Sequence, residues 1–171
     1  QELAKVYYQK AVNGPNDRAR LAAYANLGLV YLKANEPDSA YHYFFTAREN
    51  YLKKDTTESR ILFNLAVLNS NLGSVEYQRN NYQEGLQLVK KSLKIAEKLK
   101  SKTFIAGAYL KLGEGYTALN QSDSAIFYYQ KAGELARSIG YFTILSDAYH
   151  YLSDYYALEG DFENALLYYK K

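Results

Sequence analysis

Three side chains near the end of the chain have types and spacing that could do acid–base or metal chemistry. Asp147 precedes His150 by three residues, and Asp154 follows it by four. On a helix this spacing places all three near one face, where they could form a general acid–base group or a weak metal site. No nucleophile or third strong ligand accompanies them, so we expect no enzyme activity, metal or cofactor. The remaining interpretations are an acidic pocket for a Lys or Arg of a partner and a solvated helix face.

Composition excludes several other classes of site. The 171 residues include no cysteine and two histidines, which rules out disulfides, thiolate metal sites and cysteine nucleophiles. The net charge of +3 is spread along the chain without a basic block, so we expect no nucleic-acid contact. No apolar stretch approaches the ~20 residues that span a bilayer, so we expect no membrane insertion. A chain without thiols suits either redox compartment; of the two we favour the cytoplasm.

A repeated motif indicates how the chain positions its side chains. Asn26-Leu27-Gly28 recurs as Asn71-Leu72-Gly73, then as Leu112-Gly113, and more weakly as Leu152-Ser153. Thirteen residues after each Leu comes a small residue, namely Ala40, Gly85, Ala125 or Ala165. The spacings between these small residues are 45, 40 and 40, and a fixed period of this size is typical of repeat architectures.

The motif resembles the tetratricopeptide repeat family, whose signature is Leu-Gly, a Tyr, and then Ala, an aromatic residue and Ala. The resemblance covers essentially the whole chain, although Asn69, Glu76 and Val89 replace aromatics in the second copy. It implies an all-α, right-handed superhelical solenoid of antiparallel helix pairs. Repeats of about 40 residues look like those of bacterial tetratricopeptide regulators and kinesin light chains.

Residues typical of helix starts and ends give the expected helix boundaries. Asn35, Asn80, Asn120 and Gly160 tolerate left-handed backbone at a helix end, and Pro37 suits the first position of a helix. Asp55 with Glu58 predicts a capping box. We expect nine helices, at about 2–12, 17–34, 37–53, 56–80, 82–100, 102–119, 122–138, 141–158 and 161–171. They form a single array over 1–171, with a partial repeat at 1–15 and repeats at 16–54, 55–100, 101–140 and 141–171. The array is expected to be an internal fragment of a longer protein.

In arrays of this family the first helix of each pair lines a concave groove. An Asn side chain offers a donor and an acceptor, so it can bind a peptide backbone independently of sequence. Asn26 and Asn71 resemble the asparagine ladder that grips extended peptides in kinesin light chains and bacterial peptide-sensing regulators, while Lys111 and Tyr151 depart from it. The alternative is that asparagine is merely tolerated on an open surface. The candidate groove residues are Asn26, Lys33, Asn64, Asn71, Ser74, Gln78, Lys111, Glu114, Asp147, His150, Tyr151 and Asp154.

The function expected from these features is a non-catalytic scaffold that binds a protein or peptide segment in its groove. The alternative is a sensing or oligomerising regulatory region of a bacterial signal-transduction protein or transcription regulator, whose effector domain lies outside this chain. Self-association through the terminal faces is a further possibility, because Leu3, Val6, Leu166 and Leu167 would be left partly bare.

Overall fold

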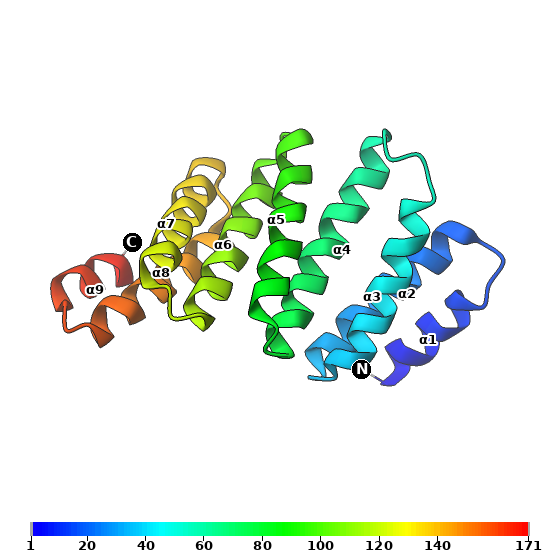
Figure 1. Cartoon of the computed structure of the whole chain (residues 1–171), viewed down its shortest axis with the longest axis horizontal. Helices are drawn as coiled ribbons and strands as arrows, with labels where there is room; N and C mark the ends of the chain where they lie inside the picture. Colours follow the sequence, from blue (N-terminus) through cyan, green and yellow to red (C-terminus); the bar gives the residue numbers. More distant parts are fainter. Residues whose placement is uncertain (1, 171) are drawn as a thin grey trace. The chain divides into compact units, whose positions relative to one another are not determined.

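The computed structural model describes residues 2–170, and over that range the chain forms nine helices and no strand (Figure 1). It divides into two compact units, Gln1–Ile95 and Ala96–Lys171, with the boundary inside α5. Within each unit, helices that follow one another in sequence pack as antiparallel pairs, which confirms the predicted helix-pair fold. The helices are α1 (Glu2–Val12), α2 (Asp17–Lys33), α3 (Pro37–Leu52), α4 (Ser59–Gln78), α5 (Tyr82–Lys98), α6 (Lys102–Ala118), α7 (Ser122–Ile139), α8 (Phe142–Leu158) and α9 (Phe162–Tyr169).

Left-handed residues end the helices as the sequence predicts. Asn35, Asn80 and Asn120 have φ angles of 58°, 61° and 55°, and Gly160 has a φ of 78°. In each case the next residue donates its N–H to a carbonyl five positions earlier, as from Glu36 to Tyr31. This bond pattern satisfies the open carbonyls of the last helical turn and directs the chain into an antiparallel partner.

The start of α4 differs from the prediction. We expected a helix from residue 56 with a capping box between Asp55 and Glu58, but α4 begins at Ser59 and Glu58 makes no side-chain cap. The Asp55 carboxylate instead accepts hydrogen bonds from the backbone N–H and the hydroxyl of Thr57. This local Asx turn competes with the helix for the same backbone groups and delays its first turn. The other described boundaries lie within two residues of the prediction.

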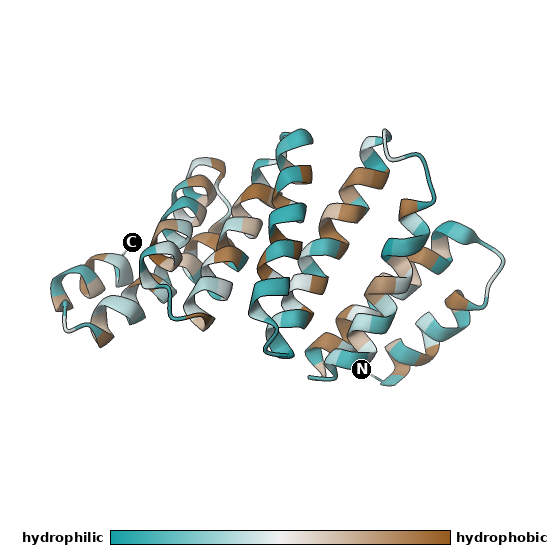
Figure 2. Cartoon of the chain, in the orientation of Figure 1, coloured by the Kyte–Doolittle hydropathy of each residue, from teal (hydrophilic) through white to brown (hydrophobic). Residues whose placement is uncertain are grey.

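Each unit has its own core, and small residues allow its helices to cross closely. A Cβ added at Gly28 would lie 2.6 Å from the ring of Phe44, and one added at Gly113 would lie 2.5 Å from the ring of Tyr129. Leu27 and Leu112 beside these glycines have no exposed surface. Figure 2 shows apolar and polar residues interspersed along the helices, and none of the described helices has the length and apolar character needed to cross a bilayer.

Stacked tyrosines join the two helices in three of the pairs, and the second pair has other residues at these positions. Glu76 and Leu88 stand at the repeat positions that elsewhere hold the two rings. Glu76 is 1% exposed, and its carboxylate accepts hydrogen bonds from Arg79 (3.1 Å) and Asn81 (2.7 Å). Glu76, which departs from the repeat pattern, is therefore a buried carboxylate with a side-chain partner on each of its oxygens. The stacked pairs are Tyr31–Tyr43, Tyr116–Tyr128 and Tyr156–Tyr168, with ring centroids 5.3, 5.4 and 5.7 Å apart.

Candidate functional site

The first candidate surface lies on α2 and α4, the first helices of two successive pairs in unit 1. Asn26 and Asn71 occupy the same repeat position on these helices, each beside a fully buried leucine, and both are half-buried. Within residues 2–170 neither side-chain amide makes a hydrogen bond or ion pair. Each amide therefore keeps its donors and its acceptor for a ligand.

Three other predicted residues on this surface bond to the backbone of their own unit. Asn64 donates to the carbonyl of Arg60 at 2.8 Å, and Ser74 reaches the carbonyl of Ser70 at 3.4 Å. Gln78 is exposed and donates across from α4 to the carbonyl of Leu32, near the end of α2, at 3.3 Å. Gln78 thus links the two first helices. Lys33, the sixth predicted residue of this unit, is exposed at the end of α2.

The second candidate surface lies on α6 and α8, the first helices of unit 2. Tyr151 on α8 is 39% exposed and stacks on the buried ring of Tyr129, with centroids 4.8 Å apart. Burial raises the pKa of Tyr151, and the carboxylates of Glu114, Asp147 and Asp154 raise it further. Because α6 and α8 pack against each other, the three predicted acids and Tyr151 contribute to one acidic, aromatic surface.

His150 lies at the exposed edge of this surface. Its Nε2 is 3.5 Å from a carboxylate oxygen of Asp154, and both side chains are largely exposed. Among the described residues no three His, Asp or Glu side chains are grouped to hold a metal ion. Asp147 is also exposed. The trio that the sequence singles out is therefore a solvated part of the acidic surface.

The environment of Glu114 gives stability a definite pH dependence. Burial raises the pKa of Glu114, Lys111 lowers it and Asp147 raises it. A carboxyl whose pKa is raised in the folded chain binds its proton more tightly there, so its contribution to stability is present at low pH and is lost as the pH rises through the raised pKa.

Glu114→Gln, which cannot ionise, should therefore become more stable relative to wild type as the pH rises from about 4 to about 7. The unfolding midpoint in urea, followed by circular dichroism, measures this. Glu134→Gln on the exposed side of α7 is the control and should show no such trend. A Glu114→Gln difference that is constant with pH would contradict this account.

A pocket that the sequence did not predict lies in unit 1, where the start of α2, the end of α3 and the start of α4 meet. Its volume is about 430 Å³. Its charged residues come from three separate segments, so no helical period connects them. The signal that could have found it is a cation at the start of α2, another just after the end of α3 and a third at the start of α4. We call it the basic pocket, and its polar lining consists of Asn16, Asp17, Arg18, Tyr51, Lys54 and Arg60.

Comparison with known proteins relates this geometry to one family. Residues 59–138 match the family model described as tetratricopeptide repeat. No curated protein has a matching sequence. The fold is similar to that of a Rap protein crystallised with Competence and Sporulation Factor, with a TM-score of 0.86 and 17% identity over 98% of this chain and 47% of that chain. The chain thus spans about half the length of the Rap protein.

Two further structures extend the comparison. The kinesin light chain-like protein BtubC (BKLC) from P. vanneervenii has a TM-score of 0.77 and 18% identity over 98% of this chain and 68% of that one. The TPR2AB domain of yeast Sti1, solved in a complex with pHSP90, has a TM-score of 0.54 and 18% identity over 88% of this chain and 62% of that one. The family match and the shared fold agree with the repeated motif. Residues 59–138 thus match the tetratricopeptide repeat family by sequence, and the chain shares the fold of these solved structures.

Proposed function

We propose that the chain binds an extended polypeptide segment, without catalysing a reaction on it, on the surfaces presented by its first helices. The observation that carries this proposal is the pair of equivalent, half-buried amides of Asn26 and Asn71, which have no partner among the described residues. A polar group in this position gains most from a ligand, because it is already partly removed from water.

The chemistry of an asparagine amide suits a peptide backbone. Its carbonyl accepts from a backbone N–H while its NH₂ donates to a backbone C=O, so the contact requires no particular side chain. Asn26 on α2 and Asn71 on α4 would hold successive parts of one extended segment. Gln78 already joins α2 and α4 and would keep the two amides in register.

The acidic surface of unit 2, taken by itself, supports binding of a basic side chain of a polypeptide. The carboxylates of Glu114, Asp147 and Asp154 each raise the pKa of Tyr151, whose ring is partly exposed. A Lys or Arg there would gain both ionic and cation–π attraction. Its charge would also relieve the unfavourable burial of Glu114, whose pKa is raised in the free chain by desolvation.

The comparisons support the same class of function. The Rap structure contains Competence and Sporulation Factor, and the Sti1 structure contains pHSP90. Both are tetratricopeptide-like folds solved with a bound partner, and recognition of peptides by preformed helical surfaces is a recurring mode of binding.

A library of displayed random peptides tests this proposal. Peptides selected on the wild-type chain should bind the Asn26→Ala/Asn71→Ala variant at least about tenfold more weakly, because each amide loses one or two backbone hydrogen bonds. Fluorescence anisotropy with labelled selected peptides measures the affinity. Asn50→Ala on α3 is the matched control, since Asn50 bonds within its own helix and lies outside this surface. Unchanged affinity in the double variant would sink the asparagine mechanism, and a failure to enrich any peptide would sink peptide binding itself.

A regulatory role within a bacterial signalling protein is the second candidate function. The observation that favours it is the shared fold with a Rap protein solved with Competence and Sporulation Factor. A regulator of this kind would couple occupancy of its first-helix surfaces to a change in its own assembly. Light scattering with and without a selected peptide distinguishes the two roles: a change in mass on binding supports regulation, and an unchanged mass supports a plain scaffold.

A further inference from the structure

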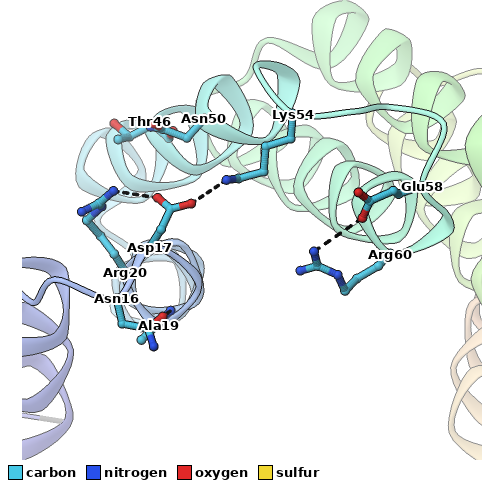
Figure 3. Close-up of polar contacts among 9 residues, drawn as sticks. All are labelled: Asn16, Asp17, Ala19, Arg20, Thr46, Asn50, Lys54, Glu58 and Arg60. Atoms are coloured by element: carbon cyan, nitrogen blue, oxygen red, sulfur yellow. Dashed lines mark hydrogen bonds and ion pairs between the residues drawn. The ribbon is translucent and has the colours of Figure 1, made fainter.

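The basic pocket carries more positive charge than its own residues neutralise. Arg18, Lys54 and Arg60 line it together with a single carboxylate, that of Asp17. The pocket lies at the ends of three helical segments of unit 1, and Figure 3 shows Arg60 extending from the start of α4 toward α2.

The one carboxylate is already occupied. Lys54 donates to one Asp17 oxygen at 2.5 Å, and Arg20 donates to the other at 2.6 Å (Figure 3). The hydrogen bond from Lys54 is the main cause of the lowered pKa of Asp17, so this group remains ionised and bound to its own neighbours. Asp17 therefore offers little to the other two cations of the pocket.

The two arginines remain available to a ligand. Within residues 2–170 the guanidinium of Arg18 makes no hydrogen bond or ion pair. Among the described residues the guanidinium of Arg60 has only a loose pair with Glu58, at 3.6 Å, in which both side chains are about half exposed. Exposed pairs of this kind contribute little, so a better-placed anion would displace Glu58.

Tyr51 gives a second, independent indication of a ligand. The residue is 6% exposed and lines the pocket, yet among the described residues its hydroxyl has no hydrogen-bond partner. Burial raises the pKa of Tyr51 even though Arg60, Lys54 and Arg18 each lower it, so the hydroxyl stays a neutral donor. The Tyr51 hydroxyl therefore opens into the pocket that the three cations also line, where a ligand can accept its hydrogen bond.

We propose that the basic pocket binds a phosphate group. Three cations and one carboxylate leave a net charge of +2 in the lining, which matches a phosphate carrying close to two negative charges at neutral pH. Two planar guanidinium forks, an ammonium group and a phenolic hydroxyl provide more donors than a carboxylate accepts, and this set suits the oxygens of a phosphate. The volume of about 430 Å³ leaves room for a small organic group attached to the phosphate. The pocket is independent of the asparagine surface on α2 and α4, because they share no residue.

Isothermal titration of the full chain with inorganic phosphate, at constant ionic strength set with chloride, tests this proposal. Arg18→Ala and Arg60→Ala should each weaken phosphate binding by at least about tenfold, as expected for hydrogen bonds to a charged group. Arg18 has no partner to lose, so its variant keeps the fold intact. Tyr51→Phe should weaken binding severalfold while keeping the ring in the core. Wild-type heats no larger than those with added chloride, or equal affinity in both arginine variants, would overturn the proposal.

Two controls separate this pocket from general effects of charge. Arg137→Ala removes an exposed arginine from unit 2 and should leave phosphate binding unchanged. Asp17→Asn removes the only carboxylate of the lining and should tighten binding, which a merely damaged pocket would not do. A second titration with phosphoserine distinguishes a phosphate ester from the free ion: tighter binding than inorganic phosphate identifies an ester, and equal or weaker binding identifies the ion. The Asn26→Ala/Asn71→Ala variant should bind phosphate like wild type, so failure of peptide binding and failure of this proposal are told apart.

Discussion

Arg79→Ala should lower the free energy of unfolding by about 3 kcal/mol, because it leaves the buried carboxylate of Glu76 without its ionic partner. Glu76 has 2% of its side chain exposed and receives the Arg79 guanidinium at 3.1 Å. Without Arg79 only Asn81 remains as a side-chain partner. Arg79 also pairs with Asp38 of α3 at 3.0 Å and lies over the ring of Tyr41, so its loss additionally loosens α4 from α3. We place the effect at the low end for a broken buried pair, since Arg79 is itself one-third exposed.

The repeat provides the control for this prediction. The first pair has Tyr31 and Ala34 where the second has Glu76 and Arg79. Glu76→Tyr/Arg79→Ala copies the first pair and removes both charges together, so it should recover most of the lost stability. Urea unfolding followed by circular dichroism gives both values. A double variant as unstable as Arg79→Ala would show that the damage comes from the contacts to Asp38 and Tyr41 instead of the stranded carboxylate.

The helix pairs were predictable because their signals are local. Asparagine or glycine in a left-handed turn ends a helix through its own backbone conformation, and the next residue closes the turn by bonding five positions back. The small residues at the crossings recur at a fixed distance from the leucines that they accompany. Gly28 and Gly113 therefore revealed the crossing of two helices before any contact was known. Both the turn residues and the small crossing residues can be recognised in a single sequence.

The start of α4 was mispredicted for an equally local reason. Asp55 and Glu58 have the spacing of a capping box, but an Asx turn to Thr57 uses the same carboxylate. Asp, Asn, Ser and Thr stabilise both arrangements, and sequence alone does not rank them.

The polar sites also differ in whether a local sequence signal predicts them. Repeat position placed Asn26 and Asn71 on equivalent sites of α2 and α4, because those positions follow from the helix-pair period. The hydrogen bond from Gln78 to Leu32 spans 46 residues, and the basic pocket joins three segments. Neither feature produces a periodic pattern in the sequence. Glu76 was visible as a departure from the repeat, but its partners Arg79 and Asn81 became meaningful only once its burial was known.

Gly113→Ala and Gly107→Ala lie in the same helix, α6, and should change stability in opposite directions. A Cβ at Gly113 would lie 2.5 Å from the ring of Tyr129, which cannot easily move because it stacks on Tyr151 and its hydroxyl bonds Thr117 at 3.1 Å. This overpacking should cost about 1–3 kcal/mol. A Cβ at Gly107 meets only a methyl of Ile144, at 3.6 Å, so alanine there should gain about 0.5–1 kcal/mol from its helix propensity. Thermal and urea unfolding of the two variants give the comparison.

The last helix pair explains why the two glycines should differ. Ser153 stands at the repeat position of Gly113 and has a Cβ, yet it is buried and donates to the carbonyl of Ala165 at 2.9 Å. The residue at the repeat position of the Tyr129 ring is Tyr169, which is 80% exposed and does not cover the crossing. A glycine is thus required where a large side chain covers the crossing, as the Tyr129 ring does at Gly113 and Val89 does at Gly73. Equal stabilisation by Gly113→Ala and Gly107→Ala would mean that the Tyr129 ring yields to a methyl group, and that α6 and α7 are held together by something other than this close approach.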